Sequence, residues 1–298
     1  MSEQREFRAG YVTIIGRPNC GKSTLMNSLL NFKLSIVTEK PQTTRHSILG
    51  ILTGESHQIV FLDTPGLLDP KYKLQEVMLK TVHNAINDGD LILFMTEAQA
   101  DFLADDMHFL KQGYHQDKPI ILTINKIDLV EKSTLLPLID LYQKSYSFVE
   151  IIPISALQRD GLDLLLDTII PYLPINPPFY PDDMITERPE RFFVSELIRE
   201  KIFLKYGEEI PYSTTVHIEE FKEREQGKDY IRAAIYVERT SQKGILIGKR
   251  GAALKEVGKL ARTEIEAFLG RPVFLELWVG VKEKWRQDKK FLKASGYY

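Results

Sequence analysis

Residues 16–23, with the sequence GRPNCGKS, carry the most specific chemical pattern in this 298-residue chain. They fit G-x-x-x-x-G-K-[ST], in which a glycine-rich backbone curls so that its N–H groups point at phosphate oxygens. In such a loop Lys22 reaches the outer phosphates and the Ser23 hydroxyl binds Mg²⁺. An apolar run at residues 11–15 precedes the loop and an amphipathic stretch at residues 22–30 follows it. The pattern therefore predicts a strand, a phosphate-binding loop and a helix that together hold a nucleoside triphosphate.

A second polar group stands at residues 63–66, Asp-Thr-Pro-Gly, directly after the apolar run 58–62. An aspartate at the end of a strand can support Mg²⁺, and the backbone N–H of a mobile glycine can point at a γ-phosphate. The pattern D-x-x-G is weak alone, but about 40 residues after a phosphate loop it becomes informative. We expect Asp63 and Gly66 to serve the same nucleotide as the first loop.

Residues 125–128, Asn-Lys-Ile-Asp, indicate which base is bound. Guanine presents N1–H and N2–H₂ donors that adenine lacks, and the Asp128 carboxylate can accept both. Asn125 would face the N7 and O6 side of the base, and Lys126 would lie along the ring plane. Adenine would leave the carboxylate unpaired, at a cost of about 1–3 kcal/mol or more. The predicted nucleotide is GTP.

The elements around these loops predict how they are brought together. Residues 47–53 and 58–62 have the pattern of a β-hairpin, and strands are expected at 91–95, 119–124 and 149–154. An amphipathic helix is expected at 102–112. The alternation predicts an α/β domain with a mostly parallel sheet, whose ligand loops lie at the carboxyl ends of the strands.

Six prolines between residues 171 and 189 disfavour both helix and sheet, which predicts an extended connector. We therefore expect a domain at 1–172, a proline-rich linker at 173–190 and a second domain at 191–298. In the second domain the pattern predicts a helix at 192–206, strands at 213–221 and 230–237, a helix–turn–helix around 243–269 and a strand at 273–279. This order indicates a smaller α+β domain.

Charge is distributed unevenly between the two halves. Residues 1–190 hold 17 Lys and Arg against 25 Asp and Glu, whereas residues 191–298 hold 22 against 16. The second half is therefore the one suited to a polyanion. The single cysteine, Cys20, excludes internal disulfides and is expected to pack beneath the phosphate loop. The chain shows no leader pattern and no apolar run of about 18 residues, so we expect a cytoplasmic location.

The first half resembles the translation-factor-like class of P-loop GTPases, with ordered motifs at residues 16–23, 42–46, 63–66, 125–128 and 155–157. The resemblance implies that Mg²⁺ is held by Ser23, Thr44 (with Thr43 as the alternative) and Asp63. It implies catalytic roles for Lys22, Thr44, Gly66 and Asn19. The nucleotide-binding residues that it implies are Gly16, Arg17, Pro18, Asn19, Cys20, Gly21, Lys22, Ser23, Thr24, Asn125, Lys126, Asp128, Ser155, Ala156 and Leu157.

Two positions differ from the Ras pattern. Leu67 follows Gly66 where Ras-like proteins carry the glutamine that orients the attacking water, and an isobutyl group cannot hydrogen-bond to water. Asn19 stands where cation-dependent GTPases carry an asparagine that helps to hold K⁺. A K⁺ ion there would supply the positive charge that an arginine finger gives elsewhere. We expect slow intrinsic hydrolysis that is faster in K⁺ than in Na⁺.

Residues 248–251, Gly-Lys-Arg-Gly, resemble the GXXG loop of a KH domain of the prokaryotic, type II order. The resemblance implies an RNA site made by Ile247, Gly248, Lys249, Arg250 and Gly251, because the glycines admit the RNA backbone and the cations neutralise phosphates. Residues 245–247 would floor an apolar groove for unstacked bases. The basic and aromatic tail at 282–291 is expected to be a solvated C-terminal helix.

With both domains, the whole chain resembles the Era family of bacterial ribosome-assembly GTPases. The resemblance implies binding of small-subunit ribosomal RNA and a role in maturation of the small ribosomal subunit, with GTP or GDP, Mg²⁺ and a candidate K⁺ as cofactors. It also implies peripheral contact with the inner face of the cell membrane. We expect a monomer with no DNA partner. The alternative is a peripheral membrane signalling GTPase whose basic domain binds anionic lipid. A tandem-GTPase relative would need a second phosphate loop, which this sequence lacks.

Overall fold

The computed structural model describes residues 6–112 and 118–297 of the chain. By their contacts the residues form two units. The first comprises Met1–Ser35, Thr44–Pro70 and Gln75–Glu187, and the second comprises Ile36–Thr43, Lys71–Leu74 and Arg188–Tyr298. The predicted domains 1–172 and 191–298 include residues 1–5, 113–117 and 298, which lie outside the described residues. The predicted boundaries themselves stay a prediction.

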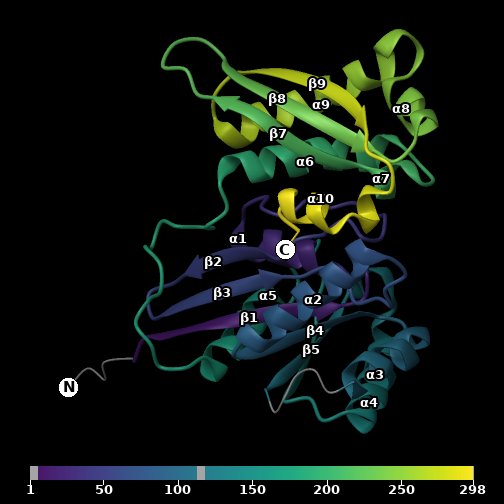
Figure 1. Ribbon diagram of the computed structural model, residues 1–298. Helices are drawn as coiled ribbons and strands as arrows, with labels where there is room; N and C mark the ends of the chain where they lie inside the picture. The colour runs from purple at the N-terminus through teal and green to yellow at the C-terminus, as the bar shows by residue number, and fades with distance from the viewer. Residues whose placement is uncertain (1–5, 113–117, 298) are drawn as a thin grey trace. The chain divides into compact units, whose positions relative to one another are not determined.

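The first unit is built on a six-stranded sheet in the order β2-β3-β1-β4-β5-β6 (Figure 1). The strands are β1 (Arg8–Gly16), β2 (Ile48–Thr53), β3 (His57–Asp63), β4 (Leu91–Glu97), β5 (Ile120–Asn125) and β6 (Glu150–Pro153). β2 pairs antiparallel with β3, which confirms the predicted hairpin, and the other pairs are parallel. The carboxyl ends of β1, β3, β4, β5 and β6 therefore lie at one edge of the sheet.

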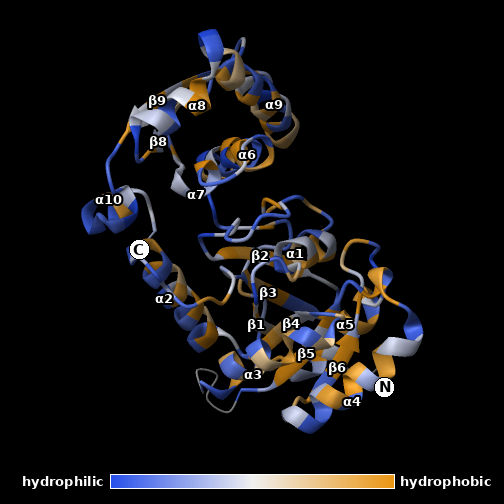
Figure 2. Ribbon diagram, turned by 90° about the vertical axis from the view of Figure 1, so that its right-hand side faces the viewer, coloured by the Kyte–Doolittle hydropathy of each residue, from blue (hydrophilic) through white to orange (hydrophobic). Residues whose placement is uncertain are grey.

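Helices cover this sheet on both faces. They are α1 (Lys22–Leu30), α2 (Lys73–Asp88), α3 (Leu103–Lys111), α4 (Leu135–Ser145) and α5 (Leu162–Ile169). Buried residues of α2, α3 and α4 share a hydrophobic cluster with alternate residues of β1, β4 and β5. α1 contacts β1, β2 and β3, and α5 contacts β6. Figure 2 colours much of β4 and β5 as hydrophobic, as expected for strands buried on both faces.

Three of these helices, α2, α4 and α5, lie where no element is predicted above. The signal was present in α2, because its apolar residues recur at helical spacing. The buried ones are Leu74, Val77, Met78, Val82, Ala85 and Ile86. Such a stripe covers one face of a sheet. The predicted helix at 102–112 is confirmed as α3, preceded by a single 3₁₀ turn.

The proline-rich segment contains no helix or strand between Leu173 and Pro189. It runs along the first unit and is fixed there by backbone hydrogen bonds. Ala9 donates to the carbonyl of Pro174 at 3.1 Å, and Ile51 donates to that of Ile185 at 2.8 Å. The buried Gln58 accepts from the N–H of Phe179 at 2.7 Å. By contact the segment thus belongs to the first unit as far as Glu187.

The second unit contains a three-stranded sheet in the order β7-β8-β9 (Figure 1), in which β7 is antiparallel and β9 parallel to β8. Its elements are α6 (Glu190–Lys205), α7 (Ile210–Ser213), β7 (Thr215–Lys222), β8 (Asp229–Val237), α8 (Thr240–Ile247), α9 (Ala252–Leu269), β9 (Val273–Val281) and α10 (Lys289–Ala294). α6 and α9 share a buried hydrophobic cluster with the three strands. The predicted α+β order is confirmed.

The C-terminal tail differs from the expected solvated helix. α10 is short, and the side chains of Trp285 and Leu292 are fully buried. The Trp285 indole donates to the carbonyl of Ser213 at 2.7 Å. The expectation of a solvated helix was wrong because the apolar residues of the tail were given too little weight. Burying the side chains of Trp285 and Leu292 stabilises the packed arrangement, and the neighbouring lysines can remain in water.

Candidate functional site

The phosphate loop lies between the end of β1 and the start of α1, as predicted. Gly16 has a φ of 153°, and a Cβ atom there would meet the Met95 carbonyl oxygen at 2.3 Å. Gly21 precedes α1 with a φ of 104°, and its Cβ would lie 2.2 Å from Asn125 Nδ2. Both positions require glycine because they combine left-handed backbone with close contacts. The sequence pattern is thus explained by the curvature of the loop.

Lys22 lies inside this curve. Its side chain is buried, and Nζ donates to the carbonyls of Gly16 at 3.0 Å and Arg17 at 2.9 Å. Cys20 is buried beside it, as expected, and burial raises the pKa of its thiol. Asn19 is exposed on the loop with a φ of 66°. The loop therefore places the ammonium group of Lys22 where phosphate oxygens would enter.

The three residues expected to hold Mg²⁺ lie together. Ser23 Oγ donates to Asp63 Oδ2 at 2.7 Å and lies 2.9 Å from Thr44 Oγ1. Ser35, which the sequence did not single out, also donates to Asp63 Oδ2 at 2.9 Å. Thr43 instead bonds to Thr38 and to the carbonyl of Lys40. The structure thus places Thr44, rather than Thr43, beside Ser23.

The chemistry of this group fits Mg²⁺, which prefers oxygen ligands. Burial raises the pKa of the Asp63 carboxyl, and hydrogen bonds from Ser23 and Ser35 and the charge of Lys22 oppose this effect. The second oxygen, Asp63 Oδ1, is buried and has no hydrogen-bond partner among the described residues. A buried carboxylate oxygen without a donor is suited to a cation or its water shell. No group of three or more His, Cys, Asp and Glu that could hold a metal occurs in residues 6–112 and 118–297.

The Asp63–Gly66 turn contacts the phosphate loop directly. The N–H of Leu67 donates to the Gly16 carbonyl at 3.0 Å, and a Cβ atom on Gly66 would meet Pro18 N at 2.7 Å. The Leu67 side chain is 5% exposed and packs in the cluster that contains Ile15 and Val82. The Leu67 side chain is therefore part of the hydrophobic core.

The residues predicted to bind the base lie at the end of β5 and directly after it. Asn125 is buried and joins two loops: Nδ2 donates to the Cys20 carbonyl at 2.8 Å, and Oδ1 accepts from Ala156 N at 2.9 Å. Lys126 has a φ of 65° and pairs with Glu97 at 2.8 Å. Asp128 is exposed and has no hydrogen-bond partner in the described part of the chain. Its carboxylate is therefore accessible at the position where the sequence predicts the base edge.

Residues 155–157 complete this side. Ser155 and Ala156 are buried, and the Ala156 carbonyl accepts from Ser28 Oγ at 2.7 Å, whereas Leu157 is 72% exposed. Sequence reasoning missed Ser35 and Glu97 in the site. Glu97 had a weak signal, because it ends β4 at the edge where the ligand loops lie. Ser35 had no sequence signal, since its contact with Asp63 spans an irregular loop.

In the second unit, residues 248–251 link α8 to α9, as predicted. Gly248 and Gly251 have φ values of 69° and 77°. Lys249 and Arg250 are exposed, and neither forms an ion pair within the described residues. The predicted apolar floor is partly wrong. Ile245 is 55% exposed, but Leu246 is fully buried in the hydrophobic cluster of this unit. The helical turn of α8 separates neighbouring side chains onto different faces, so they cannot share one surface.

No helix in the described residues has the length and apolar character needed to cross a membrane.

Comparisons with known proteins agree with this geometry. A family model described as 50S ribosome-binding GTPase matches residues 11–126, and a KH domain model matches residues 209–286. GTPase Era of Ruminiclostridium cellulolyticum is 45% identical over 291 residues, covering 98% of both chains. GTPase Era of Geotalea uraniireducens is 48% identical over 294 residues, covering 99% of both.

Two solved structures are similar over nearly the whole chain. A crystal structure of a variant of Aquifex aeolicus Era bound to GDP·AlF₄⁻ has a TM-score of 0.94 and 42% identity, covering 98% of this chain and 99% of that one. A structure of Era in complex with MgGDPNP and nucleotides 1506–1542 of 16S ribosomal RNA gives the same values. The likeness thus extends over both units. The chain belongs to the Era family of GTPases.

Proposed function

We propose that this GTPase is a switch that binds small-subunit ribosomal RNA through residues 248–251 and acts in maturation of the small ribosomal subunit. The observation that carries the proposal is the loop between α8 and α9, where Lys249 and Arg250 are both exposed between two glycines. The Era structure that contains 16S ribosomal RNA nucleotides together with MgGDPNP supports it. An exposed pair of cations beside flexible backbone suits RNA phosphates.

The nucleotide chemistry follows from the first unit. Lys22 Nζ now bonds to two loop carbonyls and would exchange them for the phosphate oxygens of GTP. Ser23, Thr44 and Asp63 would hold Mg²⁺, which supplies charge neutralisation on the phosphates when it is bound. The backbone N–H of Gly66, at the turn that contacts Pro18, would donate to the γ-phosphate. Asp128 would accept from the guanine edge.

Water activation would rely on the backbone and on cations. Because Leu67 is packed in the core, it cannot orient a water molecule. Asn19 stands exposed on the loop, and its amide oxygen is a ligand type suited to K⁺. Slow hydrolysis without a bound partner or K⁺ is the expected behaviour of such a site.

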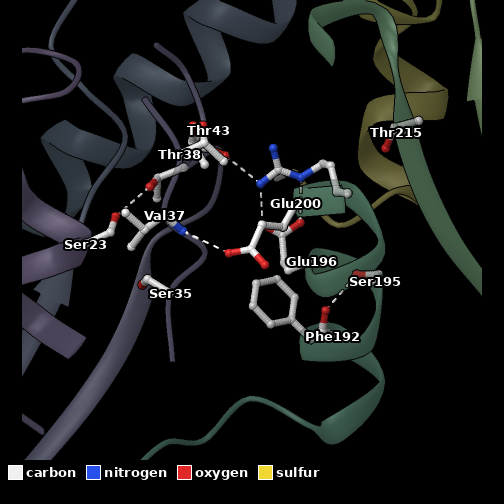
Figure 3. A network of polar contacts seen from close by, with 12 residues as sticks. Ser23, Ser35, Val37, Thr38, Thr43, Phe192, Ser195, Glu196, Glu200 and Thr215 are labelled. Carbon is white, nitrogen blue, oxygen red and sulfur yellow. Dashed lines mark hydrogen bonds and ion pairs between the residues drawn. The ribbon is translucent and has the colours of Figure 1, made fainter. Parts of the chain in front are cut away.

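A route from nucleotide to RNA is offered by the segment Ile36–Thr43 of the second unit (Figure 3). Arg199 of α6 is fully buried, pairs with Glu196 and donates to the Thr43 carbonyl at 2.5 Å. Glu200 accepts from Val37 N at 3.3 Å. Thr44, the next residue, is the Mg²⁺ candidate beside Ser23. A shift of Thr44 on GTP binding would therefore displace the peptide that Arg199 holds.

The test is RNA binding by the full chain with K249E/R250E. We expect the affinity for an oligonucleotide of the 3′ end of 16S ribosomal RNA to fall at least tenfold at constant salt. The slope of log K against log salt should also flatten, because each phosphate contact on a single strand contributes about 0.7 to it. The matched control is K132E/K144E, which makes the same charge change at exposed lysines of the first unit.

An unchanged slope in K249E/R250E would refute the RNA site. Equal loss in both variants would show that net charge alone attracts RNA. Anionic vesicles serve as a second probe: binding to vesicles that depends on Lys249 and Arg250, without RNA binding, would favour the membrane alternative instead.

A further inference from the structure

A buried polar network lies beneath the phosphate loop and contains no residue with an assigned part in the site except Arg17. Arg17 Nε donates to Asp106 Oδ1 at 2.9 Å, and its Cζ lies 3.5 Å from the ring centroid of Phe102. Asp106 is fully buried, and the Arg17 side chain is 11% exposed. Arg17 Nη2 is buried without a hydrogen-bond partner in the described residues. The contacts with the Asp106 carboxylate and the Phe102 ring therefore offset the cost of removing the guanidinium from water.

The other oxygen of Asp106 is fixed by two further elements. Oδ2 accepts from Thr96 Oγ1 at 2.5 Å and from Tyr142 OH at 2.7 Å. Thr96 belongs to β4 and Tyr142 to α4, and both are fully buried. Burial raises the pKa of Tyr142, and the charge of Asp106 raises it further, so its hydroxyl remains a donor. The carboxylate is thus held between β4, α3 and α4.

Arg17 connects this anchor to the loop that binds phosphate. Its side chain points to Asp106, while its backbone carbonyl accepts from Lys22 Nζ at 2.9 Å. Arg17 follows Gly16, the last residue of β1, so its contact with Asp106 fixes the first residue of the loop. A guanidinium released from a buried anion would turn toward water to recover its hydration. The peptide of Arg17 would move with it.

We propose that Asp106 is a positioning residue for the nucleotide, which acts through Arg17 to hold the phosphate loop in its binding shape. Thr96 and Tyr142 orient the carboxylate. The network also connects α3 and α4 to the phosphate loop through side-chain hydrogen bonds, although neither helix carries a nucleotide motif. A purely structural role would predict lower stability but normal nucleotide affinity in the folded protein.

The test measures the dissociation rate of a fluorescent GDP analogue from Asp106→Asn, Arg17→Met and the double variant, at a temperature where each is folded. We expect each single variant to release GDP at least about tenfold faster, which corresponds to about 1.4 kcal/mol. The double variant should be no faster than the worse single variant, because one residue acts through the other. Tyr142→Phe, which keeps the ring, should give a smaller change in the same direction.

Gln58→Leu is the control, because Gln58 is equally buried and hydrogen-bonded but lies at the start of β3, away from the loop. It should lower stability and leave GDP release unchanged. Additive effects of Asp106→Asn and Arg17→Met would overturn the proposal, as would normal GDP release from Asp106→Asn. Should that variant not fold, Tyr142→Phe decides: wild-type release from it would overturn the proposal.

Discussion

The side-chain amide of Asn125 donates a hydrogen bond of 2.8 Å to the backbone carbonyl of Cys20, 105 residues earlier in the chain. The same side chain accepts from the N–H of Ala156 at 2.9 Å. One buried residue therefore joins the phosphate loop, the base-binding loop and the loop after β6. This contact also explains Gly21, since a Cβ atom there would collide with the amide. The loops predicted to bind the base and the phosphates therefore share one structural support.

Removing the side-chain amide of Asn125 should weaken the binding of GDP and of GTP alike. Asn125→Ala would leave the Cys20 carbonyl and the Ala156 N–H buried without partners, at about 1–3 kcal/mol each. We expect GDP and GTP affinities, measured by titration calorimetry, to fall at least about tenfold. Thr123→Val is the matched control in the same strand, because the Thr123 hydroxyl is buried without a partner among the described residues. Affinity loss in the control, or none in Asn125→Ala, would contradict this account.

Asp128 should decide the base through its open carboxylate. In Asp128→Asn the amide cannot accept both donors of guanine, so we expect GTP affinity to fall by about 10- to 100-fold. Xanthosine triphosphate, whose base carries an oxygen in place of the amino group, should bind this variant better than wild type. Competition of GTP and of xanthosine triphosphate against fluorescent GDP measures the two affinities in each protein. Equal losses for both nucleotides would indicate a structural effect instead.

The local parts of the fold could be predicted from the sequence because each has a local cause. Left-handed glycines such as Gly16 and Gly21, and polar residues that end apolar strands, mark the phosphate and base loops. The same holds for residues 248–251, where glycines flank two cations. Such signals need only a few neighbouring residues, so the order of strands and ligand loops was predictable.

Contacts between distant residues were not predictable in the same way. Ser35 reaches Asp63 across an irregular loop, and Asp106 lies in a helix with no motif. The burial of Trp285 depends on the Ser213 carbonyl, 72 residues away. A single sequence contains no local pattern for such pairs. Which two residues come into contact depends on how whole helices and strands pack together.

Monovalent cations should change the rate of hydrolysis. Asn19 is exposed on the phosphate loop and Leu67 is packed away from it, so added positive charge is expected to come from a bound ion. We expect faster GTP turnover in KCl than in NaCl at matched ionic strength, and Asn19→Ala should abolish the difference. Leu67→Val, which keeps an apolar side chain in the core, should preserve the K⁺ effect. Equal wild-type rates in the two salts would exclude a functional K⁺ site.

Acid should destabilise the second unit through His217. This is the only histidine in residues 188–298 of the sequence. Burial lowers the pKa of His217, against the opposing charge of Glu219, and its ring stacks on Phe291 at 5.1 Å. Because the unfolded chain takes up the proton more readily, stability is present above the ordinary histidine pKa and falls as the pH drops through the folded value. One such group changes the free energy of unfolding by at most about 1.4 kcal/mol per pH unit.

The measurement is urea unfolding between pH 7.5 and 5.5, followed by tryptophan fluorescence. Both tryptophans, Trp278 and Trp285, belong to the second unit, so the fluorescence signal originates there. The midpoint should fall with pH in the wild type. His217→Phe retains an aromatic ring against Phe291 but cannot be protonated, so its midpoint should change less over this range. An identical pH dependence in both proteins would show that groups other than His217 cause the effect.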